Sequence, residues 1–250
     1  MKILFIGNSI TKGEIGESFV DLFKEQHPDW IIKNAGVNGD TLKNISYRIA
    51  KAIEENNYDF IVIEAGFNDI ILPYLDKRGL LFRFAFRYLV RKGRRPVTPE
   101  KFQVKLSQMI DFIQSKSNSK IILTTLGCIN ENLSSDINLK RIDYNGFIVK
   151  VANDYHCLVA DIAYEMDSVL NKSIQTDYLL KNFLNTVYLD KKRCRNDGGA
   201  DRLSTKRNLS LTIDGVHLNS AGALIYKQTI ERQINKNGAD FPFDDENMKT

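Results

Sequence analysis

Residues 3–11 read ILFIGNSIT, and this stretch decides the fold. Its apolar run is followed at once by glycine, asparagine and serine, which are typical of a turn. Because the run is continuous rather than alternating, it indicates a strand that is buried on both faces, as in a parallel sheet. The run is too short for a secretory signal and no cleavage site follows it, so we expect a cytoplasmic protein.

Further strands and helices alternate along the chain. Apolar runs of strand length recur at residues 30–32, 60–63, 121–123 and 158–162. Apolar residues at helical spacing lie between and after them, near residues 19–23, 42–53, 102–113, 142–149 and 223–234. Thr98 is a suitable N-cap and Pro99 a suitable first residue for the third of these helices. The β–α order repeated five times predicts right-handed crossovers and a three-layer α/β/α sandwich around a five-stranded parallel sheet.

Two segments exceed the usual length of a connection, at about residues 73–97 and 172–210. We expect insertions there that form lids, binding loops or disordered segments. The chain of 250 residues otherwise fits one domain, which we place at residues 1–237, followed by a polar C-terminal tail at 238–250.

The composition is that of an ordinary soluble protein, with 43% hydrophobic and 26% charged residues. It excludes collagen-like, disulfide-scaffold and fully disordered chains, and no apolar stretch approaches the roughly 18 residues of a membrane span. The three cysteines, Cys128, Cys157 and Cys194, have no CxxC spacing, which argues against a disulfide framework or a zinc ribbon. No His, Cys and carboxylate cluster has metal-ligand spacing, so we expect neither a metal nor a cofactor.

Polar clusters follow the first three strands and precede the last helix, at residues 7–11, 34–41, 65–69 and 214–219. Because ligands bind beyond the carboxyl ends of the strands in a parallel α/β sheet, we expect these clusters to converge. Ser9 lies at a strand-to-helix turn, His217 is the best placed base, and Asp214 is close enough to orient it. The backbone N–H groups of Ser9 and Gly39 and the side-chain amide of Asn68 are candidate donors to a developing oxyanion.

These blocks, at residues 7–11, 34–41, 66–69 and 214–217, resemble the SGNH hydrolase family, also called GDSL esterases and lipases. The resemblance implies a flavodoxin-like sandwich with strand order 2-1-3-4-5. It also implies cleavage of carboxylic esters or thioesters, often of lipids or acetylated sugars, without a cofactor. Within the site it implies that Ser9 is the nucleophile and that Gly39 and Asn68 are oxyanion donors. Asp214 and His217 would complete the catalytic triad.

The chain departs from that resemblance at position 8. The family block usually reads Gly-Asp-Ser, whereas Asn8 replaces the aspartate here. Asparagine keeps the size and one acceptor oxygen but loses the charge. We expect the turn to survive this change, because the residue is not the acid of the triad.

The residues leave several functions open. We expect a serine esterase that hydrolyses esters of acyl lipids or O-acetylated sugars through an acyl-enzyme on Ser9. An acyltransferase with a sugar or lipid alcohol as acceptor would use the same triad, and Asn8 leaves open a non-catalytic binding protein on the same fold. A nucleotide site is not indicated, because residues 7–13 contain neither Gly-Lys-Ser/Thr nor Gly-x-Gly-x-x-Gly.

The first insertion holds most of the positive charge. Residues 76–95 contain eight Lys or Arg and one Asp, although the whole chain has a net charge of only +4. A helix over residues 80–91 would carry Arg83, Arg87 and Arg91 on one stripe, and its remaining apolar circumference should be covered.

The cover could be the protein core or a second subunit, which would make a homo-oligomer. The helix could also be a lid over an acyl chain, or make a peripheral membrane contact through residues 80–95. A nucleic acid partner is not expected, because the broad basic surface with exposed aromatics that it would need is missing.

Overall fold

A five-stranded sheet forms the centre of the computed structural model, which describes residues 1–181 and 185–238. The strands are β1 (Lys2–Gly7), β2 (Ile31–Gly36), β3 (Phe60–Ile63), β4 (Lys120–Thr124) and β5 (Leu158–Ala160). All neighbouring strands pair in parallel, in the order β2-β1-β3-β4-β5. The predicted fold class and strand order are therefore confirmed. Ile3, Leu4, Phe5 and Ile6 have no exposed surface, as expected for a strand that is covered on both faces.

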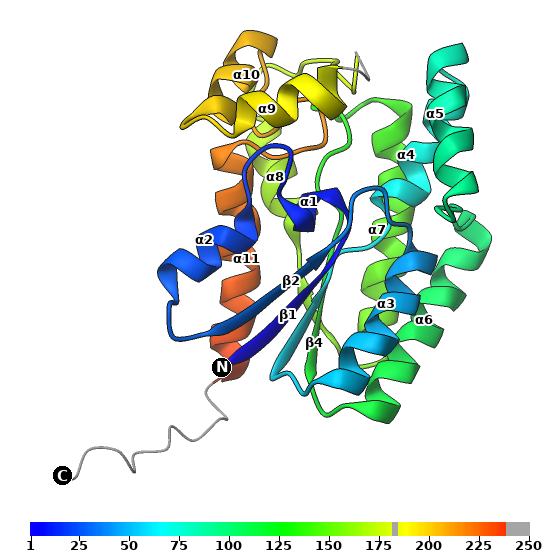
Figure 1. Ribbon diagram of the computed structural model, residues 1–250, viewed down its shortest axis with the longest axis vertical. Helices are drawn as coiled ribbons and strands as arrows, with labels where there is room; N and C mark the ends of the chain where they lie inside the picture. The colour runs from blue at the N-terminus through cyan, green and yellow to red at the C-terminus, as the bar shows by residue number, and fades with distance from the viewer. Residues whose placement is uncertain (182–184, 239–250) are drawn as a thin grey trace, which may run out of the picture.

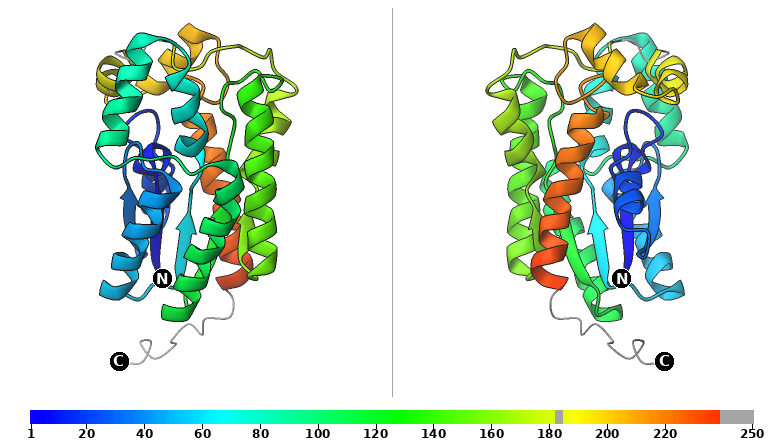
Figure 2. Two further views of the ribbon diagram at one scale, coloured as in Figure 1. Left: turned by 90° about the vertical axis from the view of Figure 1, so that its right-hand side faces the viewer. Right: turned by 90° about the vertical axis from the view of Figure 1, so that its left-hand side faces the viewer.

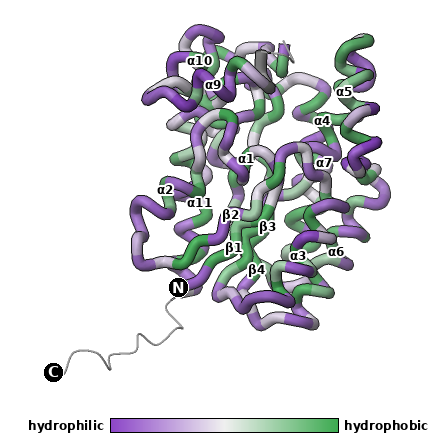
Figure 3. The backbone as a smooth tube through the Cα atoms, viewed as in Figure 1, coloured by the Kyte–Doolittle hydropathy of each residue, from purple (hydrophilic) through white to green (hydrophobic). Residues whose placement is uncertain are grey.

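Helices cover both faces of the sheet (Figure 1). One layer holds α3 (Leu42–Glu55), α6 (Pro99–Lys116) and α7 (Asp136–Asp154), and the other holds α2 (Phe19–Gln26), α8 (Ile162–Leu170) and α11 (Ser220–Gly238). The short helix α1 (Ser9–Lys12) follows β1 directly. In Figure 3 the strands are mostly hydrophobic and polar segments gather on the outer helices and loops, so the core lies between the sheet and its two helical layers.

Most of the predicted helical stripes face the core. Every apolar position predicted in α3 and in α6 is buried, and Thr98 and Pro99 begin α6 as expected. Two apolar residues of the predicted helical segments, Ile142 in α7 and Leu224 in α11, are instead exposed. The inward face of α7 instead contains the polar residues Asn138 and Arg141 beside apolar ones.

Two strand boundaries also differ from the prediction. The second strand covers residues 31–36 rather than 30–32, because it lies at the sheet edge, where Ile31 is exposed and the apolar signal is weak. The fifth strand ends at Ala160 rather than at residue 162. The Asp161 side chain accepts a hydrogen bond from the Tyr164 backbone N–H and so begins α8.

Both predicted insertions lie at the carboxyl end of the sheet (Figures 1 and 2). The first contains the end of α4 (Phe67–Asp76) and all of α5 (Leu80–Arg91), and the second contains the π-helical turn η1 (Asn185–Asp190), α9 (Lys191–Cys194) and α10 (Gly199–Arg207). The expected cover on the apolar circumference of α5 is incomplete, because no α5 residue is buried.

The predicted tail, residues 238–250, lies outside the described residues except for Gly238, which ends α11. Among the helices of the described residues, none is both long and apolar enough to cross a membrane.

Candidate active site

Ser9 is the first residue of α1, at the carboxyl end of β1. The Asn8 side chain caps this helix by accepting a hydrogen bond from the Ile10 backbone N–H at 2.9 Å. The expected turn at position 8 is therefore present, and Asn8 rather than Ser9 is the N-cap. This arrangement leaves the Ser9 hydroxyl free to face the cavity at the end of the sheet, where it is one of the lining groups.

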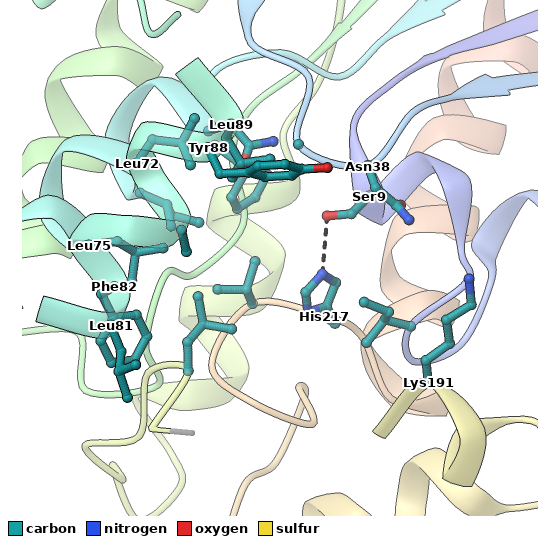
Figure 4. Close-up of a pocket in the computed structure, with 18 of the residues that line it drawn as sticks. Ser9, Asn38, Leu72, Leu75, Leu81, Phe82, Tyr88, Leu89, Lys191 and His217 are labelled. Carbon is teal, nitrogen blue, oxygen red and sulfur yellow. Dashed lines mark hydrogen bonds between the residues drawn. The ribbon is translucent and has the colours of Figure 1, made fainter. Parts of the chain in front are cut away.

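A chain of two hydrogen bonds joins Ser9 to Asp214. His217 Nε2 lies 3.1 Å from Ser9 Oγ, and His217 Nδ1 lies 2.7 Å from Asp214 Oδ2. Figure 4 shows the Ser9 hydroxyl pointing toward the His217 ring. The structure thus brings Ser9 to the neighbouring pair Asp214 and His217, with 208 positions between Ser9 and His217. Such a chain lets the imidazole take a proton from the hydroxyl while the carboxylate holds the ring.

Burial and charge act in opposite directions on the two titrating groups. Burial alone would raise the pKa of Asp214, but the charge of His217 and its hydrogen bonds lower that pKa overall. Burial alone would lower the pKa of His217, but the Asp214 charge and hydrogen bond raise it overall. The imidazole therefore accepts a proton more readily than an isolated buried histidine would.

The loop that carries Asp214 and His217 is fixed by backbone hydrogen bonds. Asp214 Oδ1 accepts from the backbone N–H groups of Val216 and His217, at 3.0 and 2.9 Å. Just before this loop, the buried Glu131 accepts from the backbone N–H groups of Ser210, Leu211 and Thr212. The segment that follows β4 thus holds, through Glu131, the start of the loop that carries Asp214 and His217.

The candidate oxyanion donors Gly39 and Asn68 line the same cavity as Ser9. Gly39 has φ of +78°, which favours glycine, and a Cβ there would approach the Arg94 side chain to 2.9 Å. The Asn68 side-chain amide donates one hydrogen bond to the Asp40 carbonyl at 2.9 Å, which leaves its second N–H for another acceptor. The structure therefore brings Ser9, Gly39 and Asn68 together as predicted.

Asp69 follows Asn68 in α4 and is hydrogen-bonded to the segment that follows Gly39. Its carboxylate is fully buried and accepts from the Leu42 N–H at 2.9 Å and from the Val97 N–H at 2.7 Å. Burial raises the pKa of the Asp69 carboxyl to about 7. One side chain thus ties the start of α4 to the start of α3 and to the end of the first insertion.

Glu64 accounts for the asparagine at position 8. The Asn8 side-chain amide donates to Glu64 Oε1 at 2.6 Å, and the Thr11 hydroxyl donates to Glu64 Oε2 at 3.1 Å. Glu64 is fully buried at the end of β3, and burial raises the pKa of its carboxyl to about 7. An aspartate at position 8 would replace a donor by a second carboxylate. The asparagine is therefore the residue that suits a buried glutamate beneath the Ser9 turn.

The cavity beside Ser9 has a volume of about 880 Å³ and is mainly apolar. Its apolar wall comes from α4 and α5 and includes Phe67, Ile71, Leu72, Leu75, Leu81, Phe82, Phe84, Ala85, Tyr88 and Leu89. In Figure 4 the labelled residues of this wall lie on one side of the Ser9–His217 pair, and Lys191 lies on the other. Lys191 is not a free cation, because its Nζ lies 2.7 Å from Glu14 Oε2. A volume of this size is in the range of small-molecule sites.

Metal-ligand clusters do not occur within the part of the chain that the structure describes: no three or more His, Cys, Asp or Glu side chains are placed to hold an ion. His27 and His156 do not reach the site. His27 instead lies 2.6 Å from Glu231 and stacks on Trp30.

The parallel sheet order and the residues gathered at its carboxyl end define an α/β hydrolase of the SGNH type. The chain belongs to the GDSL-like lipase/acylhydrolase family, whose model matches residues 5–225.

Solved structures with a similar fold are only distantly related in sequence. An acetyl xylan esterase named AlAXEase is 20% identical with a TM-score of 0.64, over 93% of this chain and 98% of that one. The enzyme LAE5, from the metagenome of Lake Arreo in Spain, is 18% identical with a TM-score of 0.61, over 94% of each chain.

Axe2, an acetylxylan esterase from Geobacillus stearothermophilus, is 20% identical with a TM-score of 0.60, over 93% of each chain. Two of its variants are described as catalytic mutants; one has a serine and the other a histidine replaced by alanine. No curated protein sequence matches this chain.

Sequence reasoning missed three supporting carboxylates. Glu64, Asp69 and Glu131 are all buried and accept hydrogen bonds from loops that carry site residues. The sequence held a signal for two of them. Glu64 is an acid directly after the apolar run of β3, and Asp69 is an acid a few residues further on. Glu131 had none, because it lies in a polar stretch that is typical of a solvated loop.

Proposed function

We propose that the chain hydrolyses carboxylic esters through an acyl-enzyme on Ser9 and that it favours acyl chains of medium or long length. The observation that carries this proposal is the hydrogen-bonded chain from Asp214 through His217 to Ser9, at 2.7 and 3.1 Å, beside a mainly apolar cavity. Membership of the lipase and acylhydrolase family supports the reaction class.

In the proposed reaction Ser9 Oγ attacks the ester carbonyl while His217 Nε2 takes its proton. Asp214 holds the ring and stabilises the imidazolium. The backbone N–H groups of Ser9 and Gly39 and the Asn68 amide donate hydrogen bonds to the oxyanion. His217 then protonates the leaving alcohol, and a water molecule attacks the acyl-enzyme by the same route to release the acid.

The cavity wall supports a preference for longer acyl chains. An ester whose carbonyl lies at Ser9 has the apolar side chains of α4 and α5 along one side. Each methylene that leaves water for such a wall contributes about 0.8 kcal/mol, so octanoate should gain a few kcal/mol over acetate. The similar acetyl xylan esterases suggest the competing substrate, an O-acetylated sugar, although their low identity supports only the fold.

Initial hydrolysis rates on p-nitrophenyl acetate and p-nitrophenyl octanoate test both parts of the proposal. We expect kcat/KM to be on the order of 100-fold higher for octanoate, and the Ser9→Ala variant to be inactive on both esters. A wild-type preference for acetate would refute the acyl-chain assignment but keep the esterase.

If folded wild-type protein hydrolysed neither ester and a fluorophosphonate probe did not label Ser9, the esterase proposal itself would fail. Labelling without hydrolysis would instead favour the acyltransferase, with a sugar or lipid alcohol as acceptor.

A further inference from the structure

The rim of the cavity carries apolar side chains that face water. On α5, Leu80, Leu81, Phe84 and Tyr88 are 70, 77, 66 and 61% exposed. Across the cavity, Tyr188 and Leu189 of η1 are 70 and 45% exposed. We call these six side chains the apolar rim. Leu81, Phe84, Tyr88 and Tyr188 also line the cavity, so the rim surrounds its entrance. An exposed apolar group of this kind marks an interaction surface rather than an ordinary solvated one.

Basic residues lie next to the apolar rim. Arg87 and Arg91 are exposed on α5, and neither forms an ion pair with any of the described residues. Lys192 and Arg195 are exposed on the opposite side of the entrance, at α9. Arg94 is different, because it is half-buried and donates to the Asn38 carbonyl at 3.0 Å. The unpaired cations therefore lie on the outward surface and not in the site.

Helix α5 has one face that lines the cavity and another that faces water. At 100° per residue, Leu80, Arg87 and Arg91 fall on one outward face of α5 and do not line the cavity. Ala85 and Leu89 fall on the cavity-lining side, and Phe84 lies at the boundary between the two faces. A helix with an apolar strip beside a basic strip matches the interface of an anionic bilayer, with arginines at the headgroups and leucine and phenylalanine in the acyl region.

We propose that the apolar rim and the cations beside it dock on an anionic lipid bilayer, so that the cavity entrance faces the membrane. Both insertions lie at the carboxyl end of the sheet, where one surface can touch both (Figure 2). Adjoining faces of α5 then contact the bilayer and the cavity. An amphiphilic ester can leave the membrane along this helix and reach Ser9 without crossing bulk water.

Vesicle sedimentation tests the docking separately from catalysis. The Ser9→Ala protein is mixed with vesicles of phosphatidylcholine alone or with phosphatidylglycerol added, at low and at high ionic strength. We expect binding to the anionic vesicles that weakens as salt is raised, and little binding to phosphatidylcholine alone. Because this protein carries no nucleophile, the result does not depend on the proposed esterase activity.

Matched variants distinguish binding through this surface from non-specific attraction of any exposed cation to the anionic vesicles. Adding Arg87→Gln and Arg91→Gln to the Ser9→Ala protein should weaken its binding to anionic vesicles about thirtyfold, since each basic residue near an anionic bilayer contributes roughly fivefold. Lys101→Gln with Lys105→Gln on α6 removes two exposed cations at the same spacing and should change the partition little. Equal effects of the two pairs would overturn the proposal.

The apolar part of the surface has its own control. Leu80→Gln should weaken vesicle binding several-fold without changing hydrolysis of p-nitrophenyl acetate, because Leu80 does not line the cavity. Leu139→Gln on α7 alters a leucine that is also exposed and should have no effect on binding. If no vesicle binding occurs and Leu80→Gln instead dissociates a dimer in analytical ultracentrifugation, the surface serves a second copy of the chain and the proposal is refuted.

Discussion

Replacing Glu64 by glutamine should flatten the dependence of stability on pH. The pKa of the Glu64 carboxyl rises from 4.5 to about 7 in the folded protein, because the group is buried. Between these values the folded chain holds a proton that the unfolded chain has lost. The contribution of protonated Glu64 to the stability of the folded protein is thus complete below about pH 4.5 and is lost as the pH rises through about 7. At 1.36 kcal/mol per pKa unit, the loss is about 3 kcal/mol.

Glutamine cannot titrate, and its carbonyl oxygen can still accept from the Asn8 amide, as Glu64 Oε1 does at 2.6 Å. Urea unfolding followed by far-ultraviolet circular dichroism at pH 5 and pH 8 measures the effect. The difference in unfolding free energy between wild type and Glu64→Gln should shift by about 2.5 kcal/mol between these two pH values, with the wild type favoured at pH 5. Asp69 has a raised pKa in both proteins, so its contribution largely cancels. Parallel pH profiles for the two proteins would refute the argument.

Three further substitutions test the site. Asp214→Asn should lower kcat/KM roughly 10⁴-fold. In the wild type, pH–rate profiles should show activity falling as the pH drops through the pKa of His217, which is raised above its usual 6.5. Asn68→Ala should reduce kcat by about 10²–10³-fold with little change in KM, and an equal loss of binding and turnover would argue against an oxyanion donor. Ala85→Trp should occupy the cavity and abolish the preference for octanoate while acetate turnover persists, whereas Ala163→Trp on α8 should leave the ratio of the two rates unchanged.

The sheet and most helices could be predicted because their apolar residues repeat at the period of the structure. The positions in α3 and α6 follow this rule without exception. Helix α7 does not, because its inward face contains Arg141, which is 2% exposed and pairs with Asp167 at 2.7 Å. The buried arginine takes an inward position that the apolar pattern does not mark, whereas Ile142, which belongs to the predicted apolar segment, is 57% exposed.

The site could be predicted as a set of residue types but not as a network. Residues 7–11, 34–41, 66–69 and 214–217 named the groups that the structure gathers around one cavity. Glu131, one of the buried carboxylates beneath them, could not be found, because its burial depends on contacts between residues far apart in the chain. Glu131 holds Leu211 and Thr212 across a separation of 80 and 81 positions, and no local pattern encodes such a contact.

Helix α5 has a thermodynamic consequence for the range of substrates. The helix buries none of its side chains, and its main packing partner is α4 rather than the sheet. We therefore expect its amide groups to exchange through local opening of the helix rather than through cooperative unfolding of the core. An acyl chain in the cavity adds apolar contacts to the inward face of α5, so cavity occupancy and helix order form a single coupled equilibrium. Under the proposed function, changes within residues 80–91 would alter chain-length selectivity without lowering the stability of Ser9, His217, Asp214 and the carboxylates that support them.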